Sequence, residues 1–93
     1  MSLRVIWTSK FKKDYKLAIK RGLDVELLDN VIRLLAADQP LPEEYNDHNL
    51  SGNWKGYREC HIQPDWLLIY RIERGILVLS LQWTGTHSDL FNK

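Results

Sequence analysis

The sequence predicts an α+β fold in which a helical hairpin packs on one face of a twisted antiparallel sheet. Three observations support this class. The chain opens on a β-branched and aromatic stretch, continues with two segments whose apolar residues recur at helical spacing, and ends in strand-like runs separated by short turns. The resulting order, β-α-α-β-β-β, is typical of α+β domains. With 93 residues the chain is expected to form a single domain over residues 1–93.

The N-terminal half carries the first strand and both helices. Residues 4–8 combine β-branched and aromatic side chains, which favours a strand. Residues 9–21 have the apolar spacing of an amphipathic helix, and Gly22 follows at the usual C-terminal position. Asp24 is a suitable N-cap for a second helix, and Pro40 lies beyond the end of its apolar pattern. The short link between the two segments predicts an antiparallel helical hairpin.

The C-terminal half reads as a strand meander. Residues 39–53 are polar and predict a loop. Three runs rich in β-branched, aromatic and aliphatic residues then follow, at 57–62, 66–72 and 76–83, each separated by a short turn. Residues 87–91 are expected to form a short tail after the last strand.

Composition excludes several classes of protein. The single cysteine, Cys60, cannot form an intramolecular disulfide, and no apolar N-terminal stretch suggests a signal peptide or a membrane span. We therefore expect a cytoplasmic protein. No His, Cys or Asp pair has helical metal-ligand spacing, and no glycine-rich phosphate loop is present, so neither a metal nor another cofactor is expected.

The net charge of +1 by itself argues against a nucleic-acid-binding protein, but the charges are segregated along the chain. Residues 9–21 are strongly basic and residues 22–48 are strongly acidic. The basic segment is either a solvated helix face or a surface that meets RNA phosphates, and the histidine motifs described next favour the second interpretation. The candidate residues for contacting RNA phosphates in this segment are Lys10, Lys12, Lys13, Lys16, Lys20 and Arg21.

Four side chains are candidates for acid–base chemistry. His48, His61 and His87 lie at strand ends or in adjoining loops, where a meander can bring them to one edge, and Asp65 lies in the turn after His61. Metal-free RNA cleavage needs a base for the ribose 2′-OH and an acid for the leaving 5′-oxygen, and histidine is suited to both near neutral pH. A lone histidine is more often a surface or packing residue, so the residues alone leave both interpretations open.

Further residues near these histidines are suited to holding RNA. Lysine and arginine stabilise phosphoryl oxygens, and aromatic rings stack on bases. The candidate RNA- and phosphate-binding residues are Lys55, Arg58, Trp66, Trp83 and Phe91.

Two long motifs carry a family resemblance. Residues 47–70 read DHNLSGNWKGYRECHIQPDWLLIY, and residues 84–91 read TGTHSDLF. Both closely resemble the signatures of YafQ-type toxins, which belong to the RelE/ParE superfamily of bacterial toxin–antitoxin systems. The predicted N-terminal strand and helix pair also fit, so the resemblance spans nearly the whole chain.

The resemblance implies a RelE-like fold and a specific activity. The protein would be the toxin of a type II toxin–antitoxin system, a ribosome-dependent endoribonuclease that cuts mRNA in the A site by metal-independent acid–base catalysis. A cognate antitoxin would bind and neutralise it, and operator DNA would be bound only through that antitoxin. A partly disordered antitoxin that folds on binding is expected to cover the active site or the basic helix.

The resemblance also implies roles for single residues. By motif position, His48, His61, Asp65 and His87 match the acid–base and active-site residues of the family, and Trp66 and Phe91 match supporting positions. We favour His87 as the general acid. His48, His61 and Asp65 remain alternatives for the base or a phosphate ligand.

One position departs from the family pattern. The family typically has arginine immediately before the Thr-Gly-Thr-His stretch, where it contacts the scissile phosphate, and this chain has Trp83. Tryptophan cannot donate a bidentate charged hydrogen bond, and loss of one such donor costs about 2.7–4 kcal/mol of transition-state stabilisation. Three explanations remain: compensation by Arg58 or Arg71, a weakened or inactive homologue, or an attenuating substitution.

Two alternative functions follow. Trp83 motivates a non-catalytic homologue that binds the antitoxin, and the ribosome, without cleaving RNA. A gyrase-poisoning activity, as in the ParE branch, ranks lower because those proteins lack this histidine set.

Overall fold

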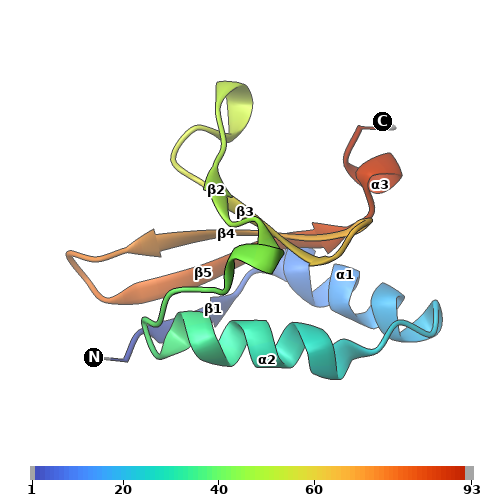
Figure 1. Ribbon diagram of the computed structural model, residues 1–93, viewed down its shortest axis with the longest axis horizontal. Helices are drawn as coiled ribbons and strands as arrows, with labels where there is room; N and C mark the ends of the chain where they lie inside the picture. Colours follow the sequence, from blue (N-terminus) through green and yellow to red (C-terminus); the bar gives the residue numbers. More distant parts are fainter. Residues whose placement is uncertain (1, 92–93) are drawn as a thin grey trace.

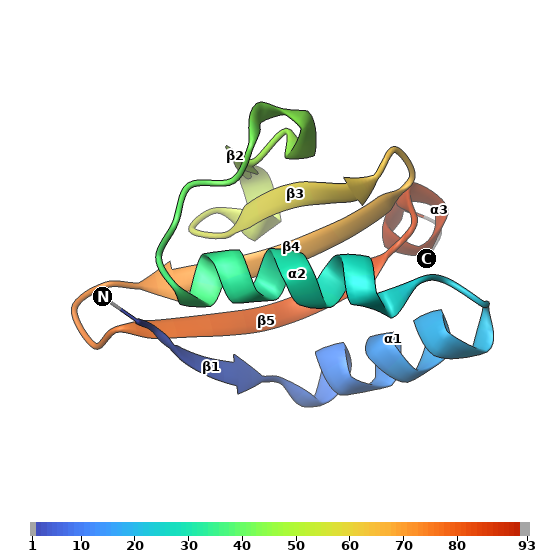
Figure 2. The ribbon, with the colours of Figure 1, turned by 60° about the horizontal axis from the view of Figure 1, so that its bottom comes forward.

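A five-stranded sheet covered on one face by two helices forms the fold, and the computed structural model describes it over residues 2–91 (Figures 1 and 2). The helices α1 and α2 lie on the same side of the sheet, below it in Figure 1, and run antiparallel in Figure 2. In chain order the elements are β1 (Arg4–Trp7), α1 (Ser9–Lys20), α2 (Val25–Ala36), η1 (Glu43–Tyr45), β2 (His48–Asn49), η2 (Gly52–Trp54), β3 (Arg58–Gln63), β4 (Trp66–Glu73), β5 (Val78–Gly85) and α3 (His87–Phe91).

The strand order is β1-β5-β4-β3-β2, and the predicted α+β class is confirmed. Strands β2 to β5 pair antiparallel, as expected for a meander. The edge strand β1 differs from the expectation, because it pairs parallel to β5, with Arg4 opposite Val78 and Trp7 opposite Leu81. The direction of β1 depends on where the helical hairpin returns the chain, and residue patterns within the strand do not encode that.

The helix ends follow from their capping residues. Thr8 Oγ1 accepts a hydrogen bond from Phe11 N (3.2 Å) at the start of α1, and Asp24 Oδ1 accepts one from Glu26 N (3.1 Å) at the start of α2. Gly22 ends the hairpin's first arm with a φ of +77°, which glycine adopts without strain. Within residues 2–91, no helix has both the length and the apolar character that a membrane span requires.

Two short elements were not expected. Strand β2 lies inside the predicted loop 39–53, and α3 replaces the predicted tail. Both are too short for a hydrophobic period to be recognised. Both also stand on the side of the sheet away from α1 and α2 (Figure 1), so they build up the face that the helices leave uncovered.

The sheet therefore has two different faces. The face toward α1 and α2 holds the main core, which includes Phe11, Leu28, Val31, Cys60, Leu68, Tyr70, Leu79 and Leu81. The opposite face, called the open face below, carries a smaller cluster of Leu67, Ile69 and Trp83, with Leu50, Trp54 and Tyr57 packed against it. Alternation along each strand sends neighbouring residues to opposite faces. This alternation decides which polar side chains meet.

Candidate active site

The three histidines converge on the open face. Glu59 and His61 alternate with the core residue Cys60 on β3, and His48 on β2 lies directly opposite Glu59. The ring centroids of His48 and His61 are 6.3 Å apart, and those of His61 and His87 are 5.7 Å apart. The fold thus places His48 and His87, which are 39 positions apart in the chain, on either side of the His61 imidazole.

Asp65 holds His87 in place. Its Oδ1 lies 2.7 Å from His87 Nδ1 and also accepts a hydrogen bond from the His87 backbone N–H at 3.1 Å. Both bonds lower the pKa of the Asp65 carboxyl below its usual value, and the bond to the His87 ring has the larger effect. Because one carboxylate oxygen binds both the ring and the backbone of His87, the orientation of the imidazole is set by the β3–β4 turn.

Glu59 is a member of the cluster that sequence reasoning missed. Its Oε1 lies 3.4 Å from His48 Nε2 and 3.6 Å from His61 Nε2, and its side chain is only 10% exposed. The signal was present in the Glu-x-His spacing of β3, which places Glu59 and His61 on the same face. Among residues 2–91, no group of three or more histidine, cysteine or acidic side chains is placed to hold a metal ion.

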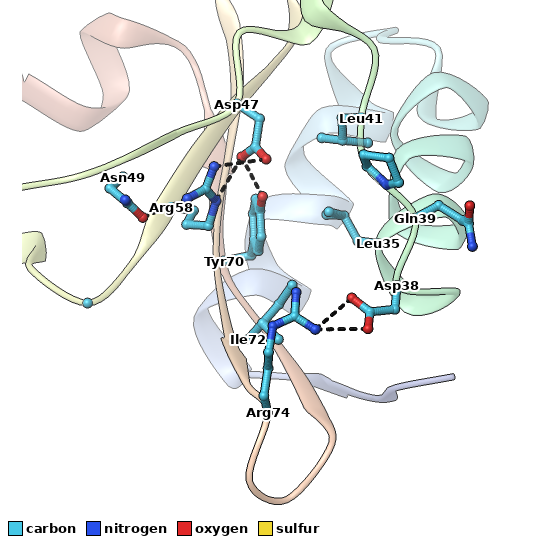
Figure 3. Close-up of a pocket in the computed structure, with 12 residues that line it drawn as sticks. Leu35, Asp38, Gln39, Leu41, Asp47, Asn49, Arg58, Tyr70, Ile72 and Arg74 are labelled. Carbon is cyan, nitrogen blue, oxygen red and sulfur yellow. Dashed lines mark hydrogen bonds and ion pairs between the residues drawn. The ribbon is translucent and has the colours of Figure 1, made fainter. Parts of the chain in front are cut away.

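Arg58 lies on the wrong side of the sheet for the role that the sequence suggested. It is paired with Tyr70 across β3 and β4 on the helix face, where its guanidinium binds Asp47 (Nη2–Oδ2 3.1 Å) and Asn49 (Nη1–Oδ1 2.7 Å). The Tyr70 hydroxyl donates a hydrogen bond to the same Asp47 carboxylate, and burial together with this bond raises the pKa of Tyr70. Figure 3 shows this network lining a cavity of about 480 Å³ beside α2.

Arg58 is therefore a structural cation on the face opposite the histidines. The physical reason is strand alternation, which directs Arg58 and Glu59 to different faces. Arg71 does belong to the open face, where it is exposed and stacks over the Tyr57 ring, with its guanidinium carbon 5.7 Å from the ring centroid. Lys55 is exposed in the loop between η2 and β3.

The two predicted stacking tryptophans are buried. Trp66 is 2% exposed on the helix side, where its Nε1 donates a hydrogen bond to Thr84 Oγ1 (2.9 Å), and Trp83 is 4% exposed against Leu67 and Ile69. Neither ring offers a free face to an RNA base, so the stacking prediction is corrected for both. The side chain of Phe91, the third predicted aromatic, lies outside the described part of the structure.

Position 83 nevertheless belongs to the candidate active site. Trp83 pairs with Ile69, and Ile69 pairs with Glu59, so the three residues form one row across the open face. Two strand spacings separate position 83 from Glu59, or about 10 Å. The Trp83 ring also lies against Gly85, where an added Cβ would meet its Cζ2 atom at 3.0 Å. The same Cβ would lie 2.9 Å from Asp89 Oδ2, so a side chain at position 85 would displace both neighbours.

The basic residues of α1 divide into two groups. Lys12, Lys13, Lys16 and Lys20 are exposed on the helix layer, away from the histidines. The other two have partners within the chain. Lys10 Nζ lies 2.5 Å from Asp14 Oδ1 and 6.0 Å from the centre of the Trp83 ring, and Arg21 forms a two-bond ion pair with Asp89 of α3.

Asp89 gives the fold a specific pH dependence. Its bonds with Arg21 and with the Thr86 backbone N–H (2.9 Å) lower its pKa from 3.8 to about 2. The folded state therefore binds this proton less readily than the unfolded state, so the stabilisation is complete above about pH 4 and is lost between pH 4 and pH 2. We expect Asp89→Asn to lower the melting temperature at pH 6, with the difference from wild type shrinking toward pH 2. Thermal unfolding at several pH values measures this, and a pH-independent difference would contradict it.

Comparison with known proteins agrees with this architecture. The chain matches the family described as "Bacterial toxin of type II toxin-antitoxin system, YafQ" over residues 3–92. It is 44% identical over 86 residues to the mRNA interferase toxin YafQ of Escherichia coli K12, covering 91% of each chain. The crystal structure of YafQ from E. coli BL21(DE3) superposes with a TM-score of 0.90 at 41% identity, covering 96% of this chain and 98% of that one.

A second solved structure is that of the E. coli DinJ–YafQ toxin–antitoxin complex, with a TM-score of 0.89 at 41% identity, covering 98% of this chain and 99% of that one. Fold, motifs and similarity place the chain among the bacterial toxins of type II toxin–antitoxin systems. Within that class, it belongs to the YafQ family.

Proposed function

We propose that residues 1–93 act as one toxin domain that cleaves mRNA in the ribosomal A site by acid–base catalysis without a metal. The observation that carries the proposal is the convergence of His48, His61 and His87 on one face, with Asp65 bonded to His87. Support comes from the relative with 44% identity, which is named an mRNA interferase.

His87 acts as the general acid in this proposal. Its Nδ1 faces Asp65 Oδ1 at 2.7 Å, so the proton passed to the leaving 5′-oxygen comes from Nε2. Asp65 orients the ring and stabilises the imidazolium, as carboxylates do in other carboxylate–histidine pairs. This assigns Asp65 a positioning role and removes it from the set of candidate bases.

The base belongs to the cluster of His48, Glu59 and His61. A neutral imidazole of this cluster accepts the 2′-OH proton, and the Glu59 carboxylate, which lies 3.4 and 3.6 Å from the two Nε2 atoms, stabilises the imidazolium that forms. The second imidazole then serves as a phosphate ligand. His61 lies between His48 and His87, so the scissile phosphate is placed above His61.

Charge on the phosphoryl oxygens is met by cations of the open face. Arg71 lies two residues along β4 from Ile69, roughly 7 Å from the row that contains Glu59 and Trp83. Lys55 lies in the neighbouring loop. Arg71 is the better placed substitute for the arginine that the family has at position 83, because Arg58 is held on the other face.

Cleavage in a translating extract tests the function. Purified protein is added to a reconstituted translation system, and primer extension maps breaks on the mRNA, with the same mRNA lacking ribosomes as the second arm. We expect A-site breaks only with ribosomes. Cleavage of the naked mRNA would overturn ribosome dependence. Intact mRNA in both arms, with Trp83→Arg equally silent, would overturn the endonuclease proposal.

The proposed partners follow the same assignment. A relative is solved in complex with its antitoxin DinJ, and we propose a corresponding antitoxin for this chain, with operator DNA bound only through it. The ribosome and mRNA are the proposed targets, which places the protein in the cytoplasm. The test is to express the chain from its native operon and purify it. Absence of a co-purifying small protein would contradict the antitoxin proposal.

The exposed lysines of α1 are expected to bind ribosomal RNA. Single reversals at Lys12, Lys13 or Lys16 should weaken ribosome binding and flatten its log–log salt slope by about 0.7–0.9 for each phosphate that is no longer neutralised. Binding measured from low to physiological salt tests this, with Arg33→Glu on α2 as the matched control. A salt slope equal to that of wild type would show that these lysines only form a solvated helix face.

A further inference from the structure

The helix α3, which begins with His87, is tied to the rest of the fold at two points. Asp65 binds His87 itself, as described above. At the other point, Asp89 Oδ2 lies 2.7 Å from Arg21 Nη1 and Oδ1 lies 3.2 Å from Nη2, so a bidentate ion pair joins the end of α1 to α3 across 68 positions of sequence. Bidentate arginine–carboxylate pairs fix geometry as well as charge.

Asp89 also caps the helix that carries His87. Its Oδ2 accepts a hydrogen bond from Thr86 N at 2.9 Å, and its own backbone N–H donates to Thr86 Oγ1 at 3.1 Å. These reciprocal bonds enclose His87 within a single turn. The Asp89 carboxylate that binds Arg21 therefore also caps α3, at the residue directly before His87.

We infer that Arg21 and Asp89 form a latch that positions His87 for catalysis, and that Arg21 is a positioning residue and does not bind the ribosome. This rests on the proposed function of His87. The five-residue α3 is too short to hold a fixed position by itself. The latch supplies the interaction that keeps the imidazole at Asp65, and displacement of a reacting group by about 1 Å costs on the order of 10²-fold in rate.

The chain contains a matched control pair. Arg74 Nη1 lies 2.8 Å from both carboxylate oxygens of Asp38, and this pair lies at the opposite end of the sheet from α3 (Figures 1 and 3). Arg21→Gln and Arg74→Gln each remove one exposed arginine–aspartate ion pair and one positive charge. They differ in whether the pair holds α3.

Two measurements test the latch. The first is the pKa of the Asp65 carboxyl by NMR titration, which reports the bond to His87 without requiring activity. Arg21→Gln should raise it toward the ordinary value, because His87 leaves Asp65, and Arg74→Gln should not. The second is the cleavage rate, where Arg21→Gln should lower kcat about tenfold or more with an unchanged KM for ribosomes. Arg21→Gln/Asp89→Asn should be no slower than the slower single variant.

The outcomes separate the latch from the proposed function. An Asp65 titration unchanged by Arg21→Gln would overturn the latch. If Arg21→Gln raises the KM for ribosomes and leaves kcat unchanged, the latch is also overturned, and Arg21 is instead a ribosome-binding residue. If wild-type protein cleaves no mRNA, the proposed function fails, whereas the Asp65 titration still decides whether Arg21 positions His87.

Discussion

Replacing His87 by glutamine should lower the rate of mRNA cleavage by about 10²–10⁴-fold, the usual contribution of a positioned acid. Glutamine keeps a polar side chain of similar reach but cannot donate a proton to the leaving 5′-oxygen. The fold should be retained, because His87 is exposed at 45% and its backbone bond to Asp65 does not depend on the imidazole. Single-turnover cleavage on ribosomes stalled at one codon measures the chemical step.

Ser88→Ala is the control for His87→Gln. Ser88 is the next residue of α3 and is not buried, so its variant reports any general sensitivity of the helix to substitution. We expect wild-type rates from Ser88→Ala. A His87→Gln variant that cleaves as fast as Ser88→Ala would show that another residue supplies the proton.

Restoring the family's arginine at position 83 should raise the cleavage rate by about 10²–10³-fold, which corresponds to the 2.7–4 kcal/mol attributed to one such donor. Position 83 shares its row with Ile69 and Glu59, so a guanidinium there extends over the face on which the histidines meet. The substitution also removes a buried indole from the cluster with Leu67 and Ile69. We therefore expect a lower melting temperature, and rates are compared well below it.

Trp83→Gln is the matched control, because it loses the same indole packing without adding a cation. If the cleavage rate rises with Trp83→Arg but not with Trp83→Gln, the chain is an attenuated nuclease. If wild type cleaves and arginine adds nothing, Arg71 already compensates, and Arg71→Gln should then abolish activity in the wild-type background. Silence of both wild type and Trp83→Arg supports the alternative, a homologue that binds antitoxin without cleaving RNA.

Much of the fold was readable from local patterns. The helices were predicted because their apolar spacing and the caps at Thr8 and Asp24 act over a few residues. The meander was predicted because turns such as Gln63-Pro64-Asp65 interrupt strongly strand-forming runs. The parallel pairing of β1 and the short β2 were missed, since both depend on contacts with distant strands.

For the candidate active site, motif resemblance proposed the histidines and Asp65, and these side chains lie close together in the structure. The other site residues depended on the face to which each side chain points. Arg58 and Trp66 carry suitable chemical groups for RNA but face the helix side, and Glu59 was overlooked although it faces the histidines.

The sequence by itself determined the two long helices, the strands β1, β3, β4 and β5 and the family, and it supplied the candidates for acid–base chemistry. These properties reside in residue type and in spacing over short distances. Only the tertiary structure decided which charges face the histidines. Pairing of β2, β3, β4 and β5 sets the register, and a shift by one residue sends a side chain to the other face. The role of Arg21 was likewise decided by the tertiary structure. In the sequence it is one more basic residue of the first helix, but the fold pairs it with Asp89, two residues after His87.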